Sequence, residues 1–203
     1  MCIRDRDGRI TITGPHFVPD STFQDFLDSK AKWILANHKH IERIVIDDGA
    51  SVPVLGKPHV INSTNMRTIS VVDDQIFVPQ NKPNIGAQVK GVLKSLARDH
   101  LVKASDHYAQ RLGHSYQSLR LRDTRSRWGS CSSDGHLMYS WRLVMAPRDV
   151  LNYVAAHEVA HLVEMNHSKS FWAVVQDIYG DYGQPRDWLR TSGNQLHRYD
   201  FNS

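Results

Sequence analysis

The sequence predicts an α+β fold, in which a β-rich N-terminal region precedes a region where a small antiparallel sheet packs beside helices. Short segments of alternating apolar and polar residues dominate the first part of the chain, and longer segments with helical spacing of apolar residues follow. In addition, Asp134-Gly135 stands between two strand-like segments, which is typical of a hairpin turn. We therefore expect three parts, at residues 1–7, 8–83 and 84–203.

The start of the chain differs in kind from the rest. Residues 1–6 are what the end of a sequencing-library transposon encodes, so residues 1–7 are expected to be an adapter artefact or a disordered segment.

In the β-rich region, one helix is expected over residues 22–38. Strands are expected at residues 8–13, 44–46, 51–55, 58–61, 68–72 and 75–78, with a hairpin turn at Asp73-Asp74. Residues 79–83, which begin and end with proline, form the clearest linker.

The last region begins with a long helix, expected over residues 85–112 and ended by Gly113. A strand at residues 118–122 alternates leucine with arginine and so has one wet face. The hairpin strands are expected at residues 127–132 and 136–143. Three helices follow: one from Pro147 to about Val163, one over residues 169–179 capped by Ser168, and one begun by Pro185.

The segment from His157 to His167 is the most informative of the chain. His157 and His161 are four residues apart, so on a helix they project from the same face and can reach one metal ion. Glu158 is rotated away from them, where it can hold a metal-bound water. His167 can complete three protein ligands and leave one position open, as a catalytic zinc site requires. The spacing predicts one zinc ion per chain.

The apolar surroundings of this motif favour the metal over two surface histidines beside a solvated glutamate. Val150, Val154, His157 and His161 form one stripe of the expected helix. Imidazoles and a carboxylate on such a stripe lose their solvation, and a metal with its water would compensate for that loss.

Three further residues near the motif carry open alternatives. Glu164 lies three residues after His161 and is a rival third ligand, although it can equally be a solvated carboxylate at the helix end. Asn166 tolerates a left-handed backbone and is expected to turn the chain, so that His167 swings back. Cys131 could be a fourth metal ligand or a nucleophile, but a packing role in a strand is favoured.

Several motifs resemble those of the YgjP-like (SprT-like) zinc metallopeptidases, and the resemblance extends from about Gly8 to the end of the chain. They are Arg-Ser-Arg-Trp-Gly-Ser-Cys-Ser-Ser-Asp-Gly at 125–135, Tyr-Ser-Trp-Arg-Leu at 139–143, Ala146-Pro147, His-Glu-x-x-His-x5-His-Ser and Phe171-Trp172. Ser140 departs from the family, which usually has Asn there.

The resemblance implies a zincin-like fold for residues 84–203 and a zinc-dependent metallopeptidase. His157, His161 and His167 would be its metal ligands, and Glu158 would be the catalytic base that assists attack of zinc-bound water on a peptide bond. A second group to stabilise the oxyanion is not identified by sequence. The candidates by residue type are Tyr153, Tyr179, Tyr182 and Arg127.

The expected partner is a protein or peptide substrate. Arg127, Trp128, Gly129 and Ser130 are candidate substrate-binding residues, because peptides often bind by adding a strand to a sheet edge. Two other functions stay open: a DNA-associated SprT-like protease, and a non-catalytic zinc-stabilised binding module, against which the intact Glu158 argues. The net charge of +4 gives nucleic-acid binding only weak support.

The compartment and the assembly are less constrained. No apolar run approaches the roughly 20 residues that span a bilayer, so no membrane association is expected. With Cys2 in the suspect segment, only Cys131 is left, which fits a reducing cytoplasm. The oligomeric state is left open.

Overall fold

The computed structural model describes residues 2–6, 9–15, 17–37 and 43–202, in two compact units that divide between Arg43 and Ile44. In the first unit, β1 (Cys2–Arg6) pairs antiparallel with β2 (Arg9–Thr13), and α1 (Asp20–Asn37) follows. Residues 1, 7, 8 and 38 of the expected segments lie outside the described residues. The expected origin of residues 1–7 and the expected domain boundary after residue 83 stay predictions.

The second unit contains a four-stranded sheet in the order β4-β5-β7-β6. Its strands are β4 (Ser51–Val54), β5 (Lys57–Thr64), β6 (Ser70–Val72) and β7 (Gln75–Pro79). The hairpin expected at Asp73-Asp74 is confirmed, because Val72 and Gln75 are partners across it. β4 and β5 are joined at Leu55 and Gly56, which both have positive φ. The backbone N–H of Leu55 donates to the carbonyl oxygen of Val144 (2.6 Å), so this turn is attached to the region that carries the histidines.

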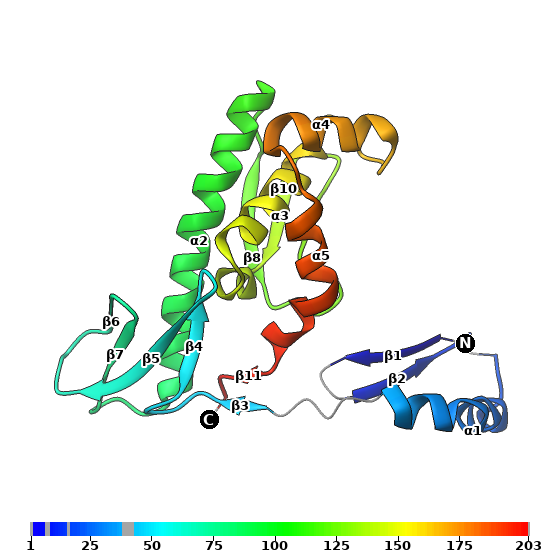
Figure 1. The fold of residues 1–203 in the computed structure, drawn as a ribbon, viewed down its shortest axis with the longest axis horizontal. Coiled ribbons are helices and arrows are strands. Elements are labelled where there is room, and N and C mark those ends of the chain that lie inside the picture. Colours follow the sequence, from blue (N-terminus) through cyan, green and yellow to red (C-terminus); the bar gives the residue numbers. More distant parts are fainter. Residues whose placement is uncertain (1, 7–8, 16, 38–42, 203) are drawn as a thin grey trace. The chain divides into compact units, whose positions relative to one another are not determined.

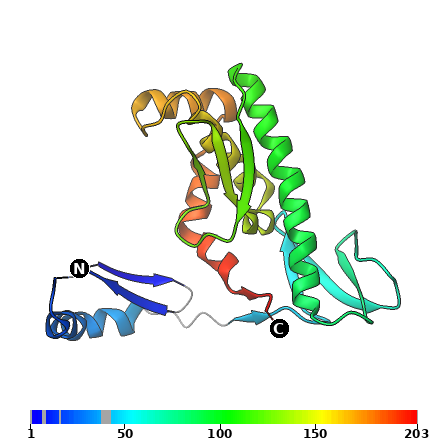
Figure 2. The ribbon, with the colours of Figure 1, turned by 180° about the vertical axis from the view of Figure 1, so that it is seen from behind.

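Helix α2 (Ile85–Leu112) has the predicted bounds and runs along the four-stranded sheet and the sheet that contains residues 118–140 (Figures 1 and 2). The side chain of Asn84 accepts a hydrogen bond from the N–H of Ala87 and caps its start. Gly113, with φ of 67°, ends it as predicted. Its buried face includes Val89, Leu93, Ala97 and Leu101, which belong to one core with the strands and the later helices.

The second sheet has the order β8-β10-β9, with β8 (Ser118–Arg122), β9 (Gly129–Cys131) and β10 (His136–Ser140). The predicted hairpin at Asp134-Gly135 joins β9 to β10 and is confirmed. The sheet is mixed, however, and not wholly antiparallel: β8 runs parallel to β10. The reason is that residues 123–128 carry the chain past β10 before the hairpin brings it back. β10 also ends at Ser140, and η1 (Trp141–Met145) continues as a buried 3-10 helix instead of strand.

Helix α3 (Arg148–Ala160) lies between α2 on one side and α4 (Lys169–Tyr179) and α5 (Gly183–Ser192) on the other (Figure 1). Ser168 caps α4 as predicted, since its hydroxyl accepts from the N–H of Phe171 (3.2 Å). The prediction for Asn166 is wrong, because it has no positive φ. Instead, the N–H groups of Val163 and Glu164 bond to the carbonyl of Ala160 and turn the chain at the end of α3.

The chain ends with η2 (Gly193–His197) and β11 (Tyr199–Asp200). β11 pairs parallel with β3 (Ile44–Val45) at the start of the second unit. The α+β class is thus confirmed. Among the described residues, every helix is too short or too polar to cross a membrane.

Arg142 links η1 to the C-terminal segment, and we expect its removal to destabilise the fold. Its guanidinium bonds to the carboxylate of Asp123 (2.7 Å) and to the carbonyl oxygens of Leu196 (2.9 Å) and Tyr199 (3.3 Å). Arg142→Met should lower the free energy of unfolding by roughly 2–3 kcal/mol, because hydrogen bonds to a charged group are lost from a mostly buried site. Urea denaturation followed by circular dichroism measures this change.

Arg190→Met is the matched control, because the Arg190–Asp187 pair is 75% and 68% exposed. Exposed pairs contribute between about 0 and 1 kcal/mol, so this variant should stay near the wild type. Equal losses from the two substitutions would contradict the role given to Arg142.

Candidate metal centre

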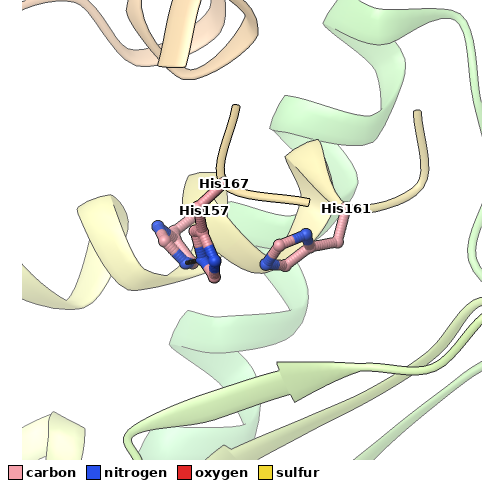
Figure 3. A group of neighbouring side chains, drawn as sticks. All are labelled: His157, His161 and His167. Atoms are coloured by element: carbon pink, nitrogen blue, oxygen red, sulfur yellow. Dashed lines mark hydrogen bonds between the residues drawn. The ribbon is translucent and has the colours of Figure 1, made fainter. Parts of the chain in front are cut away.

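Three imidazoles converge at the end of α3. His157 lies in the last turn of the helix, His161 is its C-terminal cap, and His167 comes from the loop before α4. Figure 3 shows the rings with nitrogens turned toward one region. The Nε2 atoms of His157 and His167 are 3.0 Å apart. One nitrogen from each of the three rings lies within 4.8 Å of the others, so the three residues predicted as ligands could hold one ion.

The rings are oriented in two different ways. Nδ1 of His161 is 2.9 Å from the carbonyl oxygen of Glu164 and can donate to it, which leaves Nε2 with a free lone pair. His157 is held by ring packing, with centroids 4.9 Å from Phe171 and 5.6 Å from Trp172. Its Nδ1 atom is buried and has no hydrogen-bond partner among the described residues. Aromatic packing therefore fixes the orientation of the His157 ring, whereas a hydrogen bond fixes that of the His161 ring.

The protonation state of these rings suits a cation. Burial lowers the pKa of His157 to about 3, and the neighbouring imidazoles add to the effect. Burial likewise lowers the pKa of His161. Neutral imidazoles keep the lone pairs that a metal needs. Zinc–nitrogen bonds of about 2.0–2.1 Å at tetrahedral angles put two ligating nitrogens about 3.3 Å apart, close to the 3.0 Å between His157 and His167. The donor set fits zinc.

Glu158 is buried beside this group, at 6% exposure. Its carboxylate makes no hydrogen bond or ion pair with the described residues. Burial raises the pKa of Glu158 to about 8, and the charge of Arg127 offsets part of that rise. A nearby cation would favour the ionised form further. A lone buried carboxyl next to three converging imidazoles is therefore suited to a site that supplies positive charge.

Gly129 in β9 makes room for this carboxylate. A Cβ atom at position 129 would lie 2.5 Å from Oε1 of Glu158 and 2.7 Å from its Cδ, far inside van der Waals contact. No positive φ is needed there, so the glycine is required by space and not by backbone conformation. β9 and α3 can approach this closely only because residue 129 has no side chain.

Two pockets meet at Glu158. The first, which we call the metal pocket, has a volume of about 370 Å³ and is lined by the three histidines, Glu158, residues 129–131 of β9, Arg127 and Met165. The second pocket, of about 250 Å³, shares Arg127, Gly129, His157 and Glu158 with it. The walls that belong to the second pocket alone are Trp128, Tyr153, Val154 and Leu189.

Comparison with known proteins identifies the family. The sequence model of the YgjP-like metallopeptidase domain matches residues 2–192. The chain belongs to the YgjP-like metallopeptidase family. Among solved structures, it is similar to the metallopeptidase zymogen of Pyrococcus abyssi abylysin, with 20% identity and a TM-score of 0.42 over 49% of this chain and 97% of that one. No curated protein matches the chain.

The YgjP-like site gathers most of the residues that the sequence indicated. Arg127, Gly129 and Ser130, three of the predicted substrate-binding residues, line the metal pocket, and Trp128 lines the second pocket. Of the oxyanion candidates, Arg127 and Tyr153 reach a pocket. The hydroxyl of Tyr179 instead donates to the carbonyl of Asp149 (2.9 Å), and Tyr182 stacks on Trp172.

Glu164 and Cys131, the two alternative metal ligands, lie near the histidines but have other roles. The carboxylate of Glu164 is not in the group of converging donors in the described chain; its backbone carbonyl is the partner of His161. Burial raises the pKa of the Cys131 thiol to about 11, with a further contribution from Glu158. The thiol donates to the carbonyl of Ser132 (3.3 Å). A protonated thiol is a poor nucleophile, and the thiol is not in the group of converging donors in the described chain, which favours the packing role.

Sequence reasoning missed Met165 and Leu189. Met165 is 48% exposed and lines the metal pocket. Its sequence context could have indicated this role, because a methionine between two polar residues, Glu164 and Asn166, lies in the loop that carries His167. Leu189 is far from the motif in sequence, and only the packing of α5 brings it to the second pocket.

The contact between Gly129 and Glu158 generates a prediction for Gly129→Ala. The added methyl group collides with the carboxylate and must displace it. Because a displacement of about 1 Å in an active site can cost about 100-fold in rate, peptidase activity should fall by about that factor. Zinc affinity, measured by competition with a chelator, should be unchanged, since the three atoms nearest to the new methyl group all belong to Glu158.

Gly91→Ala is the control for this change. A Cβ at Gly91, on the exposed side of α2, would meet nothing within 4 Å, and alanine favours a helix. Activity should be unaffected in this variant. Full activity in Gly129→Ala would show that the carboxylate can occupy another position.

Proposed function

We propose that this metallopeptidase hydrolyses peptide bonds with one zinc ion held by His157, His161 and His167, and with Glu158 as general base. The observation that carries the proposal is the buried, unpaired carboxyl of Glu158 beside three converging imidazoles. A structural zinc site has no need of such a carboxyl, because it is closed by four ligands. This argues against a non-catalytic binding module.

The sparse use of cysteine supports a cytoplasmic location.

The chain's own groups have distinct tasks in this mechanism. Zinc would supply a Lewis acid that acidifies a water molecule and polarises the substrate carbonyl. Glu158 takes the proton from the attacking water and delivers it to the leaving amine. The guanidinium of Arg127, which belongs to both pockets, can stabilise the developing oxyanion. Gly129 leaves the space that this carboxylate occupies.

The substrate is proposed to bind along β9. This strand pairs with β10 on one side and lies at the edge of the described sheet on the other. Residues 129–131 line the metal pocket, so an extended peptide that adds to this edge passes over the histidines. Main-chain hydrogen bonds of this kind do not depend on sequence, which suits an enzyme that accepts unfolded protein.

The mechanism predicts that Glu158→Gln separates metal binding from turnover. The amide keeps the size of the carboxyl but cannot accept a proton, so cleavage of an unfolded protein should fall at least 100-fold, within the range of about 10²–10⁴ for general bases. Zinc content by atomic emission should remain one ion per chain, whereas His167→Ala should lose the metal.

Glu164→Gln is the matched control, with the same chemical change six residues along the chain. Its backbone carbonyl still bonds to His161, so both zinc and activity should be retained. Loss of zinc in Glu164→Gln would make that carboxylate a ligand, and unchanged turnover in Glu158→Gln would overturn the mechanism.

A DNA-associated protease is the second candidate, and one observation favours it. Arg120 and Arg122 are both exposed on β8. If they contact phosphates, Arg120→Gln/Arg122→Gln should weaken duplex binding and lower the slope of log affinity against log salt by about 2. Fluorescence anisotropy with a labelled duplex measures this. Absence of binding by the wild type at low salt would remove the candidate and leave the peptidase proposal untouched.

A further inference from the structure

We propose that the second pocket is a subsite for one large apolar side chain of the substrate, at a residue next to the scissile bond. This inference rests on the proposed peptidase function and adds a specificity to it. The pocket shares Gly129, His157 and Glu158 with the metal pocket. A side chain seated in it therefore belongs to a residue directly beside the carbonyl that the metal pocket receives.

The chemistry of the walls selects the occupant. Val154 and Leu189 supply aliphatic surface, and Trp128 and Tyr153 supply aromatic surface. Pockets for drug-sized ligands begin at about 300 Å³, so a volume of about 250 Å³ suits a single large side chain such as Leu, Met or Phe. The hydroxyl of Tyr153 makes no hydrogen bond with the described residues. It is free to meet a backbone carbonyl of the substrate.

Trp128 is held in place from behind by η2. Its ring is stacked on His197, with centroids 5.3 Å apart and planes 23° from parallel. A Cβ atom on Gly193 would lie 3.2 Å from the indole, so the backbone of η2 packs directly against the ring. The indole therefore has little freedom to fill the pocket itself.

Tyr153, which also lines the pocket, is held in the same manner. Its ring stacks on Tyr182 (6.0 Å, 17°) and meets Tyr179 edge-on (5.8 Å). Aromatic pairs of this geometry add stabilisation beyond the burial of their area. The two walls are thus set before any substrate arrives, which reduces the entropic cost of ordering them on binding. A preformed apolar slot beside the reacting carbonyl is the arrangement of a specificity site.

A peptide library tests the inference with the zinc-loaded full-length chain. Peptides that differ only in the residue on either side of the scissile bond are digested, and the products are quantified by mass spectrometry. The wild type should prefer Leu, Met or Phe over Ala at one of the two positions. Leu189→Phe should reduce that preference at least 10-fold in kcat/KM ratio, because one methylene in an apolar pocket already changes such ratios by roughly 10–200-fold.

Leu189→Ala provides a second variant with the opposite effect: the wider pocket should shift the preference toward Trp. The control is Gln184→Phe, which adds the same ring to α5 at an exposed residue outside both pockets. It should leave the preference of the wild type unchanged. Circular dichroism spectra confirm that the three variants are folded.

The outcomes separate this inference from the proposed function. Cleavage by the wild type with no apolar preference, with a preference for acidic residues, or with a preference that Leu189→Phe leaves intact would overturn the subsite and keep the peptidase. If the wild type cleaves nothing, the proposed function fails. Anisotropy with a labelled Leu-containing peptide then decides the subsite: weaker binding to Leu189→Phe supports it, and equal binding overturns it.

Discussion

The close approach of β9 to α3 at Gly129 and Glu158 is the constraint on which the site depends. It brings a sheet edge, a buried carboxyl and the imidazoles of the same helix into one small volume. If the strand stood farther off, Glu158 would be hydrated and the raised pKa that burial gives it would vanish. If a side chain occupied position 129, the carboxyl could not sit beside His157. The motif on the helix is therefore only half of the site.

The rest of the second unit fixes these two elements relative to each other. The hydroxyl of Tyr139 in β10 accepts a hydrogen bond from Ser105 of α2 (3.0 Å) and donates one to the carbonyl of Ala155 in α3 (3.4 Å). These two buried hydrogen bonds connect β10 to both helices. A hydrogen bond from the N–H of Ser140 to the carbonyl of Trp128 (2.8 Å) fixes β9 just before Gly129. Buried polar groups that are fully paired specify one arrangement of a core, and here that arrangement is the one that closes β9 on α3.

Local signals were sufficient for the parts of this arrangement that are local in sequence. The bounds of α2 and α4, the Ser168 cap and the hairpin at Asp134-Gly135 follow from caps, turns and periodicity, and the structure confirms them. The spacing of the three histidines likewise predicted their convergence. The parallel pairing of β8 with β10 was missed, because strand order depends on where the chain crosses. The 3-10 helix η1 was also missed, since an apolar run has no periodicity to distinguish it from strand.

The two pockets also differ in how close together in the sequence their lining residues lie, and this difference has a physical consequence. The donors of the metal pocket come mostly from one continuous segment, so their geometry survives small shifts of the surrounding elements. The second pocket takes its walls from β9, α3 and α5, supported by η2, and any relative movement of these elements changes its shape. Metal binding should thus tolerate changes in the C-terminal helices that alter the choice of substrate. If the second pocket is the proposed subsite, substitutions in α5 retune specificity while the chemistry proposed for Glu158 stays the same.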